Sequence, residues 1–430
     1  MDEWKCASLD EAVVINPPRR LRRGAESDYV PMEALEPGYR EVVPVRRRMY
    51  TGSGATFTNG DTLLARITPC LENGKTAYVD RLSPGAVAHG STEFIVLSGR
   101  QGITDSRFVY YLARDPAFRE YAIKRMEGSS GRQRVPVSAL ANYQFLLPSL
   151  RGQLAISNLL GSLDDKIELN RRTNETLEAM ARAIFKSWFV DFGPVRAKAA
   201  GRQPVGMDTE TAALFPDSFE ESELGDIPRG WKIARLDEVV QLNPASIGKD
   251  YPHPVIQYID ISSVTVGHLD GVTTYTISDS PSRAQRLVSP GDTIWSCVRP
   301  NRKSYLFIHE PAENVVVSTG FVVLSPRVLT PSYLYAWVTC DQFVDYLAAN
   351  ADGSAYPAVR PEHFAGAEVL VPSGSTLEAF ETLAGPMRDR IAANDREAAT
   401  LAEIRDALLP KLLSGEVRVH ETERMVGNRT

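Results

Sequence analysis

Apolar residues recur with a period of seven along two long stretches of the chain. In the first stretch, one line of positions holds Ile156, Leu163, Asn170, Leu177 and Ile184, and a second line holds Leu160, Ile167, Asn174, Ala181 and Trp188. In the second stretch, 224 residues later, the lines hold Phe380, Met387, Asn394, Leu401 and Leu408, and Ala384, Ile391, Ala398, Arg405 and Leu412. This spacing predicts two long helices, each with an apolar seam of the coiled-coil type. Asn170 and Asn394 take the same place in the two seams, and a lone seam Asn fixes the register of paired helices.

The segments that precede each predicted helix also occur twice. EWKCASLDEAVVINP (Glu3–Pro17) returns as GWKIARLDEVVQLNP (Gly230–Pro244), and STEFIVLS from Ser91 returns as STGFVVLS from Ser318. Further matched pairs are a Gly-Asp-Thr turn before an apolar strand (60–63 and 291–294), a helical stretch (106–126 and 332–349) and a strand that ends at Pro148 or Pro372. The chain is therefore a tandem duplication of about 225 residues, here called the first and the second repeat.

We expect an α+β fold, in which two similar globular α/β domains are joined by two long helices. Helices with matching seams shield their apolar faces by packing together, and a chain that begins each repeat with a globule must loop back to pair them. This predicts an antiparallel intramolecular coiled coil with pseudo-twofold symmetry. The expected boundaries are a first domain at 1–148, a central helix at 149–192, a surface connector at 193–228, a second domain at 229–372, a distal helix at 373–416 and a polar tail at 417–430.

Composition places the chain among globular proteins of two or three domains, since 430 residues are 43% hydrophobic and 24% charged. No apolar run approaches the roughly 20 residues of a membrane span, and the N-terminus does not resemble a signal peptide, so a cytoplasmic protein is expected. The four cysteines are scattered without metal-ligand spacing, which predicts neither disulfides nor zinc.

The net charge of −6 by itself argues against a nucleic-acid partner. The stretch 208–226, however, contains seven acidic residues and no Lys or Arg, and basic residues are concentrated elsewhere. Charge therefore leaves DNA binding open without favouring it over ordinary solvated faces.

Motifs for catalysis are incomplete. Asn16-Pro17-Pro18-Arg19 resembles the Asn-Pro-Pro-aromatic motif of amino-methyltransferases but lacks the aromatic residue that stacks on a flipped base. Gly74-Lys75-Thr76 lacks the earlier glycine of a phosphate-binding loop, and no His pattern fits a metal site. Asp61 and Asp292 repeat, but a Gly-Asp-Thr turn before a strand is more often a turn-former than an acid. We expect no catalytic site, no metal and no cofactor in this chain.

The residues suited to recognition lie in loops at matching places of the two repeats, where Arg, Lys, Asn and Gln can contact bases and phosphates. The candidates are Arg46, Arg47, Arg48, Arg66, Lys75, Arg132, Gln133 and Arg134 in the first repeat, and Arg299, Asn301, Arg302, Lys303, Ser354 and Tyr356 in the second. The framework repeats while the loop tips differ, so two similar domains would read two different short sequences.

Three long segments resemble the specificity subunits of type I restriction-modification systems: LDDKIELNRRTNETLEAMARAIFKSWFVDFGPVRAK (Leu163–Lys198), TAALFPDSFEESELGDIPRGWK (Thr211–Lys232) and LAEIRDALLPKLLSGEVRV (Leu401–Val419). The chain departs from the Pro-x-x-Gln that starts each long helix in many members, because only Gln153 is kept in the first repeat and no Gln in the second.

The resemblance implies a non-catalytic subunit with two target-recognition domains, each reading half of a bipartite site in double-stranded DNA. It also implies helices that set the gap and bind two modification subunits, with restriction subunits added in the full complex. S-adenosylmethionine, ATP and Mg²⁺ would then be bound by those partners. Phe185, Trp188 and Phe189 are candidates for partner docking, although packing against the chain's own domains is an equal alternative.

Two other functions remain open at this point. A coiled-coil scaffold whose globules bind proteins rather than DNA would share the same architecture. A self-sufficient methyltransferase would need a cofactor site, which the sequence does not contain.

Overall fold

The computed structural model describes residues 4–42, 46–129, 131–222, 225–353 and 356–419. It divides into two compact units: unit 1 comprises residues 1–172 and 394–430, and unit 2 comprises residues 173–393. Each unit thus contains one globular domain together with helical segments from both repeats. The tail beyond residue 419 lies outside the described residues.

The globular part of unit 1 is built on two four-stranded sheets. Its strands are β1 (Lys5–Ser8), β2 (Val13–Ile15), β3 (Glu26–Val30), β4 (Arg46–Met49), β5 (Thr56–Phe57), β6 (Asp61–Ala65), β7 (Thr76–Tyr78), β8 (Ala88–Gly90), β9 (Phe94–Gly99) and β10 (Gln144–Leu147). One sheet has the order β2-β9-β6-β7, the other has the order β4-β3-β8-β5, and β1 pairs with β10. Strand β6 is buried along its whole length, including the polar Asp61 and Thr62 at its start.

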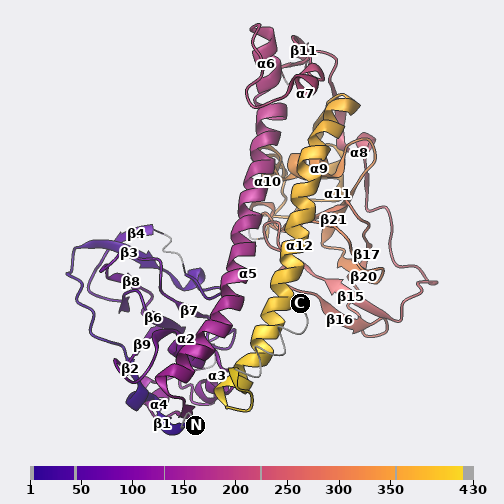
Figure 1. Ribbon diagram of the computed structural model, residues 1–430. Helices are drawn as coiled ribbons and strands as arrows, with labels where there is room; N and C mark the ends of the chain where they lie inside the picture. Colours follow the sequence, from indigo (N-terminus) through magenta and orange to yellow (C-terminus); the bar gives the residue numbers. More distant parts are fainter. Residues whose placement is uncertain (1–3, 43–45, 130, 223–224, 354–355, 420–430) are drawn as a thin grey trace. The chain divides into compact units, whose positions relative to one another are not determined.

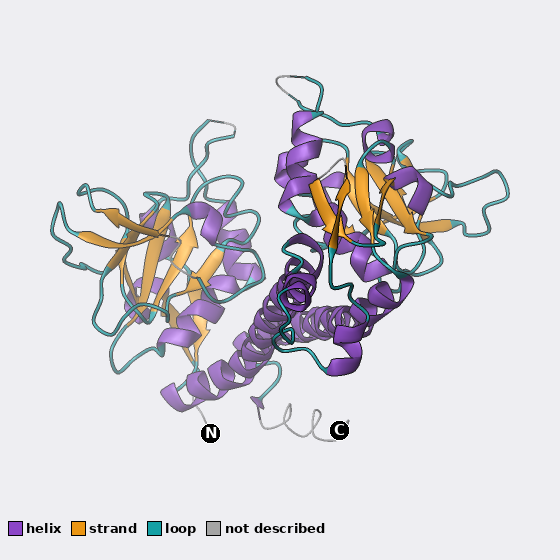
Figure 2. Cartoon of the chain, turned by 90° about the horizontal axis from the view of Figure 1, so that it is seen from above, coloured by secondary structure: helices purple, strands orange, loops and turns teal. Residues whose placement is uncertain are grey.

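Helices cover these sheets (Figures 1 and 2). They are α1 (Leu9–Ala12), the short η1 (Met32–Ala34), α2 (Ser106–Arg114), α3 (Pro116–Ile123) and α4 (Val137–Ala141). The single helical stretch predicted for 106–126 is in fact two helices. Asp115 separates them because its extended backbone ends α2, while its carboxylate accepts a hydrogen bond from Ala117 N at 3.2 Å and Pro116 occupies the first position of α3.

Unit 2 repeats this plan. Its strands are β11 (Phe219–Ser222), β12 (Gly225–Pro228), β13 (Lys232–Arg235), β14 (Val240–Leu242), β15 (Val255–Ile259), β16 (Thr273–Thr276), β17 (Ala284–Leu287), β18 (Thr293–Ser296), β19 (Tyr305–Phe307), β20 (Val315–Ser318), β21 (Phe321–Pro326) and β22 (Glu368–Val371). Its sheets have the orders β14-β21-β18-β19 and β16-β15-β20-β17, and β13 pairs with β22. The short helices are α8 (Leu236–Val239), η3 (Ile261–Ser263), η4 (Pro300–Arg302), α9 (Pro331–Thr339), α10 (Asp341–Ala349) and α11 (Pro361–Ala365). The stretch predicted as one helix at 332–349 is again two, α9 and α10, divided at Cys340.

The repeated Asn-Pro motif has the same structural role in both units. Asn16 and Asn243 have left-handed backbones, with φ of 50° and 51°. Each side-chain oxygen accepts a hydrogen bond at 2.9 Å from a neighbouring strand, Asn16 from Val96 N and Asn243 from Val323 N. Asn tolerates this conformation better than most residues, so the motif ends a strand and serves the fold.

The two long helices are α5 (Leu150–Phe185) and α12 (Gly374–Leu413) (Figure 1). Helix α5 continues into one π-helical turn, η2 (Lys186–Val190). At the start of α5, the buried Gln153 donates to Ile103 O and Pro148 O and accepts from Asp105 N, so the retained Gln fixes the helix start. Every predicted seam residue is buried or partly buried.

Within each unit, segments of α5 and α12 run in opposite directions. In unit 1, Asp164 contacts Arg405 and Asn170 contacts Asn394. In unit 2, Asn174 Nδ2 donates to Ile391 O at 3.4 Å, and Phe185 packs on Phe380. The seam Asn170 donates from Nδ2 to the Asn394 backbone carbonyl at 3.3 Å and to Glu397 Oε2 at 2.8 Å. A buried amide that is satisfied by the opposite helix favours one register.

The segment 193–228 was predicted to be a surface connector, and this prediction was wrong in part. It contains α6 (Gly193–Ala199), α7 (Thr209–Ala213) and the β11–β12 hairpin. Val195, Phe215 and Ile227 are buried in the core of unit 2. The sequence obscured this because short groups of apolar residues between Gly, Pro and acidic residues have no sustained period.

Among the described residues, no helix has both the length and the apolar character needed to cross a membrane.

Candidate nucleic-acid interface

Backbone hydrogen bonds hold two loops of unit 1 together. Val135 N donates to Arg66 O at 2.9 Å, and Thr68 N donates to Gln133 O at 3.0 Å. The candidates Arg66, Gln133 and Arg134 therefore come from segments far apart in sequence and lie in one loop cluster. Lys75 is at the far end of the first loop, where its carbonyl accepts from Ala65 N and its Nζ donates to Met32 O at 3.2 Å.

Arg134 is positioned by a carboxylate that the sequence analysis missed. Its Nη2 donates to Glu93 Oε1 at 2.7 Å and its Nε donates to Glu93 Oε2 at 2.9 Å. The hydrogen bonds from Arg134 lower the pKa of Glu93, so the carboxylate stays charged. The sequence does carry a signal for Glu93, because it is the one residue in which STEF of the first repeat differs from STGF of the second. Arg132, on the same loop, is exposed.

The corresponding loops of unit 2 are held together in the same way. Arg299 N donates to Pro357 O at 2.7 Å, and Val298 forms a β-bridge with Ala358 as Ile67 does with Arg134. The Arg299 guanidinium lies 4.6 Å from the centroid of the Tyr356 ring, which is 71% exposed. An exposed ring that stacks on arginine offers a flat apolar surface beside a positive charge.

The remaining candidates of unit 2 lie on the turn η4 and beside it. Asn301 and Arg302 are exposed, whereas Lys303 Nζ donates to Asp341 Oδ1 at 2.8 Å. This hydrogen bond raises the pKa of Lys303 and lowers that of Asp341. Ser354 lies outside the described residues. The tips of the two loop clusters thus differ in their charged and aromatic groups, while their backbone frames agree.

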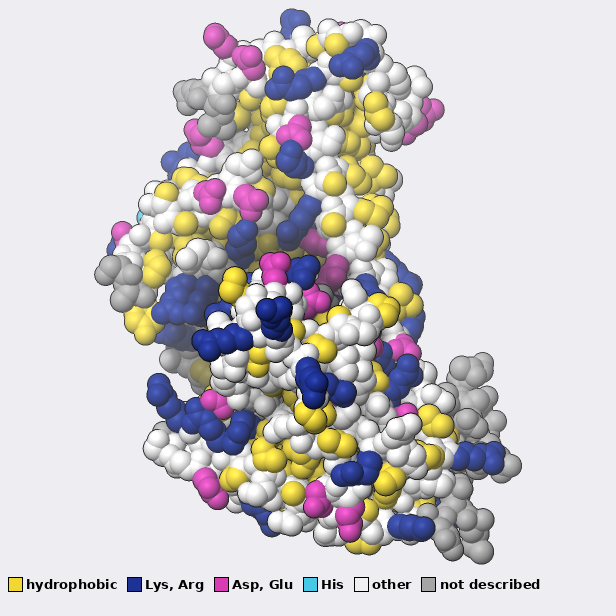
Figure 3. Space-filling model, turned by 90° about the vertical axis from the view of Figure 1, so that its left-hand side faces the viewer, with side chains coloured by type: hydrophobic (Ala, Val, Ile, Leu, Met, Phe, Trp, Pro, Cys, Tyr) yellow, Lys and Arg dark blue, Asp and Glu magenta, His cyan; other side chains and the backbone are white. Residues whose placement is uncertain are grey.

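Arg46, Arg47 and Arg48 lie on β4, in a different sheet from the Arg66 cluster. The Arg46 and Arg48 guanidinium groups are 5.7 and 5.0 Å from the Tyr29 ring centroid, and Arg47 Nη2 donates to Glu26 O at 3.2 Å. All three arginines are exposed. On the face shown in Figure 3, Lys and Arg side chains gather in clusters, a distribution that suits contact with phosphates.

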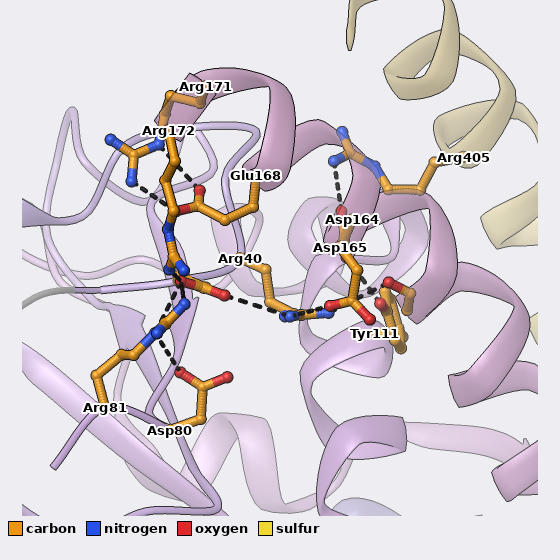
Figure 4. Close-up of polar contacts among 12 residues, drawn as sticks. Arg40, Asp80, Arg81, Tyr111, Asp164, Asp165, Glu168, Arg171, Arg172 and Arg405 are labelled. Atoms are coloured by element: carbon orange, nitrogen blue, oxygen red, sulfur yellow. Dashed lines mark hydrogen bonds and ion pairs between the residues drawn. The ribbon is translucent and has the colours of Figure 1, made fainter. Parts of the chain in front are cut away.

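A buried polar junction joins the first domain to both long helices within unit 1 (Figure 4). Arg405 of α12 is 2% exposed and donates from Nη1 to Asp164 Oδ1 of α5 and to Gly38 O, each at 2.8 Å. Tyr111 Oη donates to the other oxygen of Asp164 at 2.7 Å, and burial raises the pKa of this phenol. Arg405 lies in the predicted seam, but the sequence does not identify its partner.

A second set of ion pairs continues from this junction (Figure 4). Arg40 Nη2 donates to Asp165 Oδ1 of α5 at 2.6 Å, and Glu41 accepts from Arg81 at 2.6 Å and also from Arg172 of α5. Glu41 is 8% exposed, so these arginines compensate a buried charge. The first domain is therefore fixed to α5 by specific charge pairs as well as by apolar contacts.

The three residues proposed for partner docking are not available for it. Phe185, Trp188 and Phe189 are 3%, 6% and 1% exposed and pack in the core of unit 2. Phe189, for example, lies edge-on to Tyr333 with ring centroids 4.8 Å apart. The alternative, packing against the chain's own domain, is correct, because the aromatic cluster closes the core where α5 ends.

Residues that resembled catalytic groups have structural roles. Asp61 Oδ2 accepts from Thr58 N at 2.9 Å, and Asp292 Oδ2 accepts from Ser289 N at 2.7 Å, so both close the turn before a strand. Burial raises the pKa of the Cys297 thiol to about 11, which keeps it protonated and unreactive near neutral pH. No group of three or more possible metal-ligating side chains occurs in the described residues.

Comparisons with known proteins agree with the resemblance seen in the sequence. Residues 50–179 match the family model of the type I restriction modification DNA specificity domain. The type I restriction enzyme HindI specificity subunit of Haemophilus influenzae is 27% identical over 421 residues, which cover 83% of this chain and 86% of that protein. The MjaIX specificity subunit of Methanocaldococcus jannaschii is 25% identical over 329 residues, which cover 74% and 70%.

Solved structures give a matching fold. The S subunit of a type I restriction-modification system from M. genitalium superposes with a TM-score of 0.54 at 15% identity, over 96% of each chain. The relatives are specificity subunits rather than catalytic ones, as the sequence predicted for this chain. Residues 50–179 thus match the specificity domain of type I restriction-modification systems, and the chain is similar to type I specificity subunits over most of its length.

Proposed function

We propose that this chain gives a type I restriction-modification complex its DNA sequence specificity, and that each globular domain reads one half of a bipartite target. The observation that carries the proposal is the pair of equivalent loop clusters. Each is built on the same backbone frame, yet one presents Arg132, Gln133 and Arg134 and the other presents Arg299, Arg302 and Tyr356. Equivalent frames with different tips are what two readers of different sequences require.

The paired helices would set the gap between the half-sites. Support comes from the antiparallel contacts of α5 with α12 in each unit and from the buried Asn170 and Asn394. We infer an intramolecular coiled coil with pseudo-twofold symmetry. Its outer surface would bind two modification subunits, and restriction subunits would join the full complex. S-adenosylmethionine, ATP and Mg²⁺ would be bound by those partners rather than by this chain.

Base-resolution mapping of DNA methylation in the source cell tests the proposal. The unaltered chain should give a split motif with a fixed gap. R134A should relax the motif in one half only and Y356A in the other half only, because each residue belongs to a different domain. K124A is the matched control in unit 1, since Lys124 is exposed at the end of α3 and pairs with Glu120 of that helix.

A gel-shift assay at several salt concentrations, with the modification subunit present, separates this proposal from a scaffold that does not bind DNA. A DNA reader should lose affinity steeply as salt rises, because counterions are released on binding. Absence of any salt-dependent shift, or methylation of one continuous motif that both variants alter equally, would refute the assignment.

A further inference from the structure

In each unit, an arginine of α12 pairs with a carboxylate of α5. In unit 1, Arg405 Nη1 lies 2.8 Å from Asp164 Oδ1, and the side chains are 2% and 3% exposed. In unit 2, Arg388 Nη1 lies 3.4 Å from Glu178 Oε2, with Arg388 6% exposed and Glu178 24%. Both acids belong to α5, in the first repeat, and both arginines belong to α12, in the second repeat.

The internal duplication places opposite charges at equivalent positions. Asp164 and Arg388 are 224 residues apart, the same offset that relates the seams. Each contacts the equivalent tyrosine of its own unit: Tyr111 Oη donates to Asp164 at 2.7 Å, and the Arg388 guanidinium lies 3.9 Å from the Tyr335 ring centroid. Tyr111 and Tyr335 are also 224 residues apart. The two equivalent positions therefore keep the same neighbouring tyrosine but carry opposite charges, Asp164 in the first repeat and Arg388 in the second.

We propose that this inversion makes the first repeat pair with the second repeat and prevents either repeat from pairing with a second copy of itself. If α5 met a second α5 in the same antiparallel register, Asp164 would face Glu178 of the copy, and the contact would occur twice. If α12 met a second α12, Arg388 would face Arg405 of the copy, again twice. Buried like charges are costly, and removing one partner of a buried pair is strongly destabilising.

The partner that the inter-helix surface fits is thus the complementary repeat. The first seam line alone does not distinguish the two partners, because both copies present Asn at its third place and apolar side chains at the other four. Discrimination between partners often rests on charges that penalise the wrong pair. This pairing rule concerns assembly of the chain and does not depend on DNA recognition.

The rule can be tested on the whole folded chain. A protease site is inserted after Val205, whose side chain is fully exposed at 102%, and the folded protein is cleaved there. The cleaved protein is unfolded in urea and refolded, and the resulting pairs are counted by native mass spectrometry. Unsubstituted protein should give pairs of a first with a second repeat. Pairs of two identical repeats, here called like pairs, should be at least about a hundredfold rarer than random pairing of the fragments would give.

Charge exchange within one pair should abolish the discrimination. The double substitution E178R with R388E leaves the native pair oppositely charged. It also makes the pairs between two identical repeats attractive. In a pair of first repeats Asp164 then faces an arginine, and in a pair of second repeats Arg405 faces a glutamate. Like pairs should rise at least about tenfold. D164R with R405E should act in the same way by symmetry, and E178Q with R388Q should produce a smaller rise. An E120K with K124E exchange on the exposed face of α3 is the control and should change nothing.

Two results would overturn the proposal. One is a statistical mixture of pairs in the unsubstituted chain, whatever the variants do. The other is an unchanged proportion of like pairs in every exchange variant that refolds, including the milder glutamine pair, which introduces no new charge.

Discussion

Replacing Arg405 with methionine should destabilise unit 1 selectively. The guanidinium is 2% exposed and donates to Asp164, to Asp406 and to the Gly38 carbonyl. Methionine keeps much of the apolar stem but leaves the Asp164 carboxylate buried without its closest positive partner. Breaking a buried ion pair from one side costs about 3–5 kcal/mol.

The loss should lie near the lower end of that range. Asp164 still accepts a hydrogen bond from Tyr111, and Arg114 Nη1 lies 4.0 Å from it. We therefore expect R405M to lower the free energy of unfolding of unit 1 by about 3 kcal/mol. D164N removes the charge that Arg405 compensates, so R405M combined with D164N should cost less than the sum of the single changes, by at least about 1.5 kcal/mol.

Hydrogen exchange measured by mass spectrometry separates the two units. In R405M, peptides from α2 and from the end of α12 should exchange faster, whereas those from α9 and α10 serve as the internal control in unit 2. Additive single changes would show that the pair is not coupled. Equal loss of protection in both units would contradict a junction that is local to unit 1.

Three further predictions concern single positions. N16A should cost unit 1 about 1–2 kcal/mol, because alanine at φ 50° is strained and Val96 N loses its acceptor, and N16G should recover the part due to strain in urea unfolding. Burial lowers the pKa of His89, so its contribution to the stability of unit 1 should be complete above pH 6.5 and be lost as the pH falls through the lowered pKa; H89Q should flatten this dependence in thermal melts. F189A should destabilise unit 2 by about 3–5 kcal/mol in hydrogen exchange, whereas a residue that only docks a partner would weaken partner binding and leave stability unchanged.

The sequence predicted the features that depend on local pattern. The seams, the strands after the Gly-Asp-Thr turns and the twofold order of elements follow from periodicity that is visible within a few residues of each position. The division of the helix at Asp115 was missed although the sequence carries its signal, because an aspartate followed by proline is typical of a helix start. The structure of segment 193–228 was missed because its apolar residues, such as Leu214-Phe215 and Ile227, form short groups without a sustained period.

The candidate site was predicted less completely, because its geometry depends on residues distant in sequence. The loop positions of Arg66 and Arg134 could be found by comparing the repeats, but the carboxylate of Glu93 that positions Arg134 could not be assigned without knowing that the loops meet. The burial of Phe189 in its own domain could not be decided from the sequence, because helical periodicity gives no information about a domain that packs on the far side of the seam.

The two kinds of contact in this duplicated chain have diverged differently, and the reason is physical. Asn16 with Val96, and Asn243 with Val323, are contacts within one repeat, and both copies retain them because each is complete without the other copy. Asp164 with Arg405 joins the two repeats, so its two residues occupy non-equivalent positions that can change together without loss of stability. A duplicated protein can therefore keep its framework symmetric while the surface between its copies becomes asymmetric. Under the pairing rule proposed above, that asymmetry directs each repeat to the other, as a reader of two unlike half-sites would require.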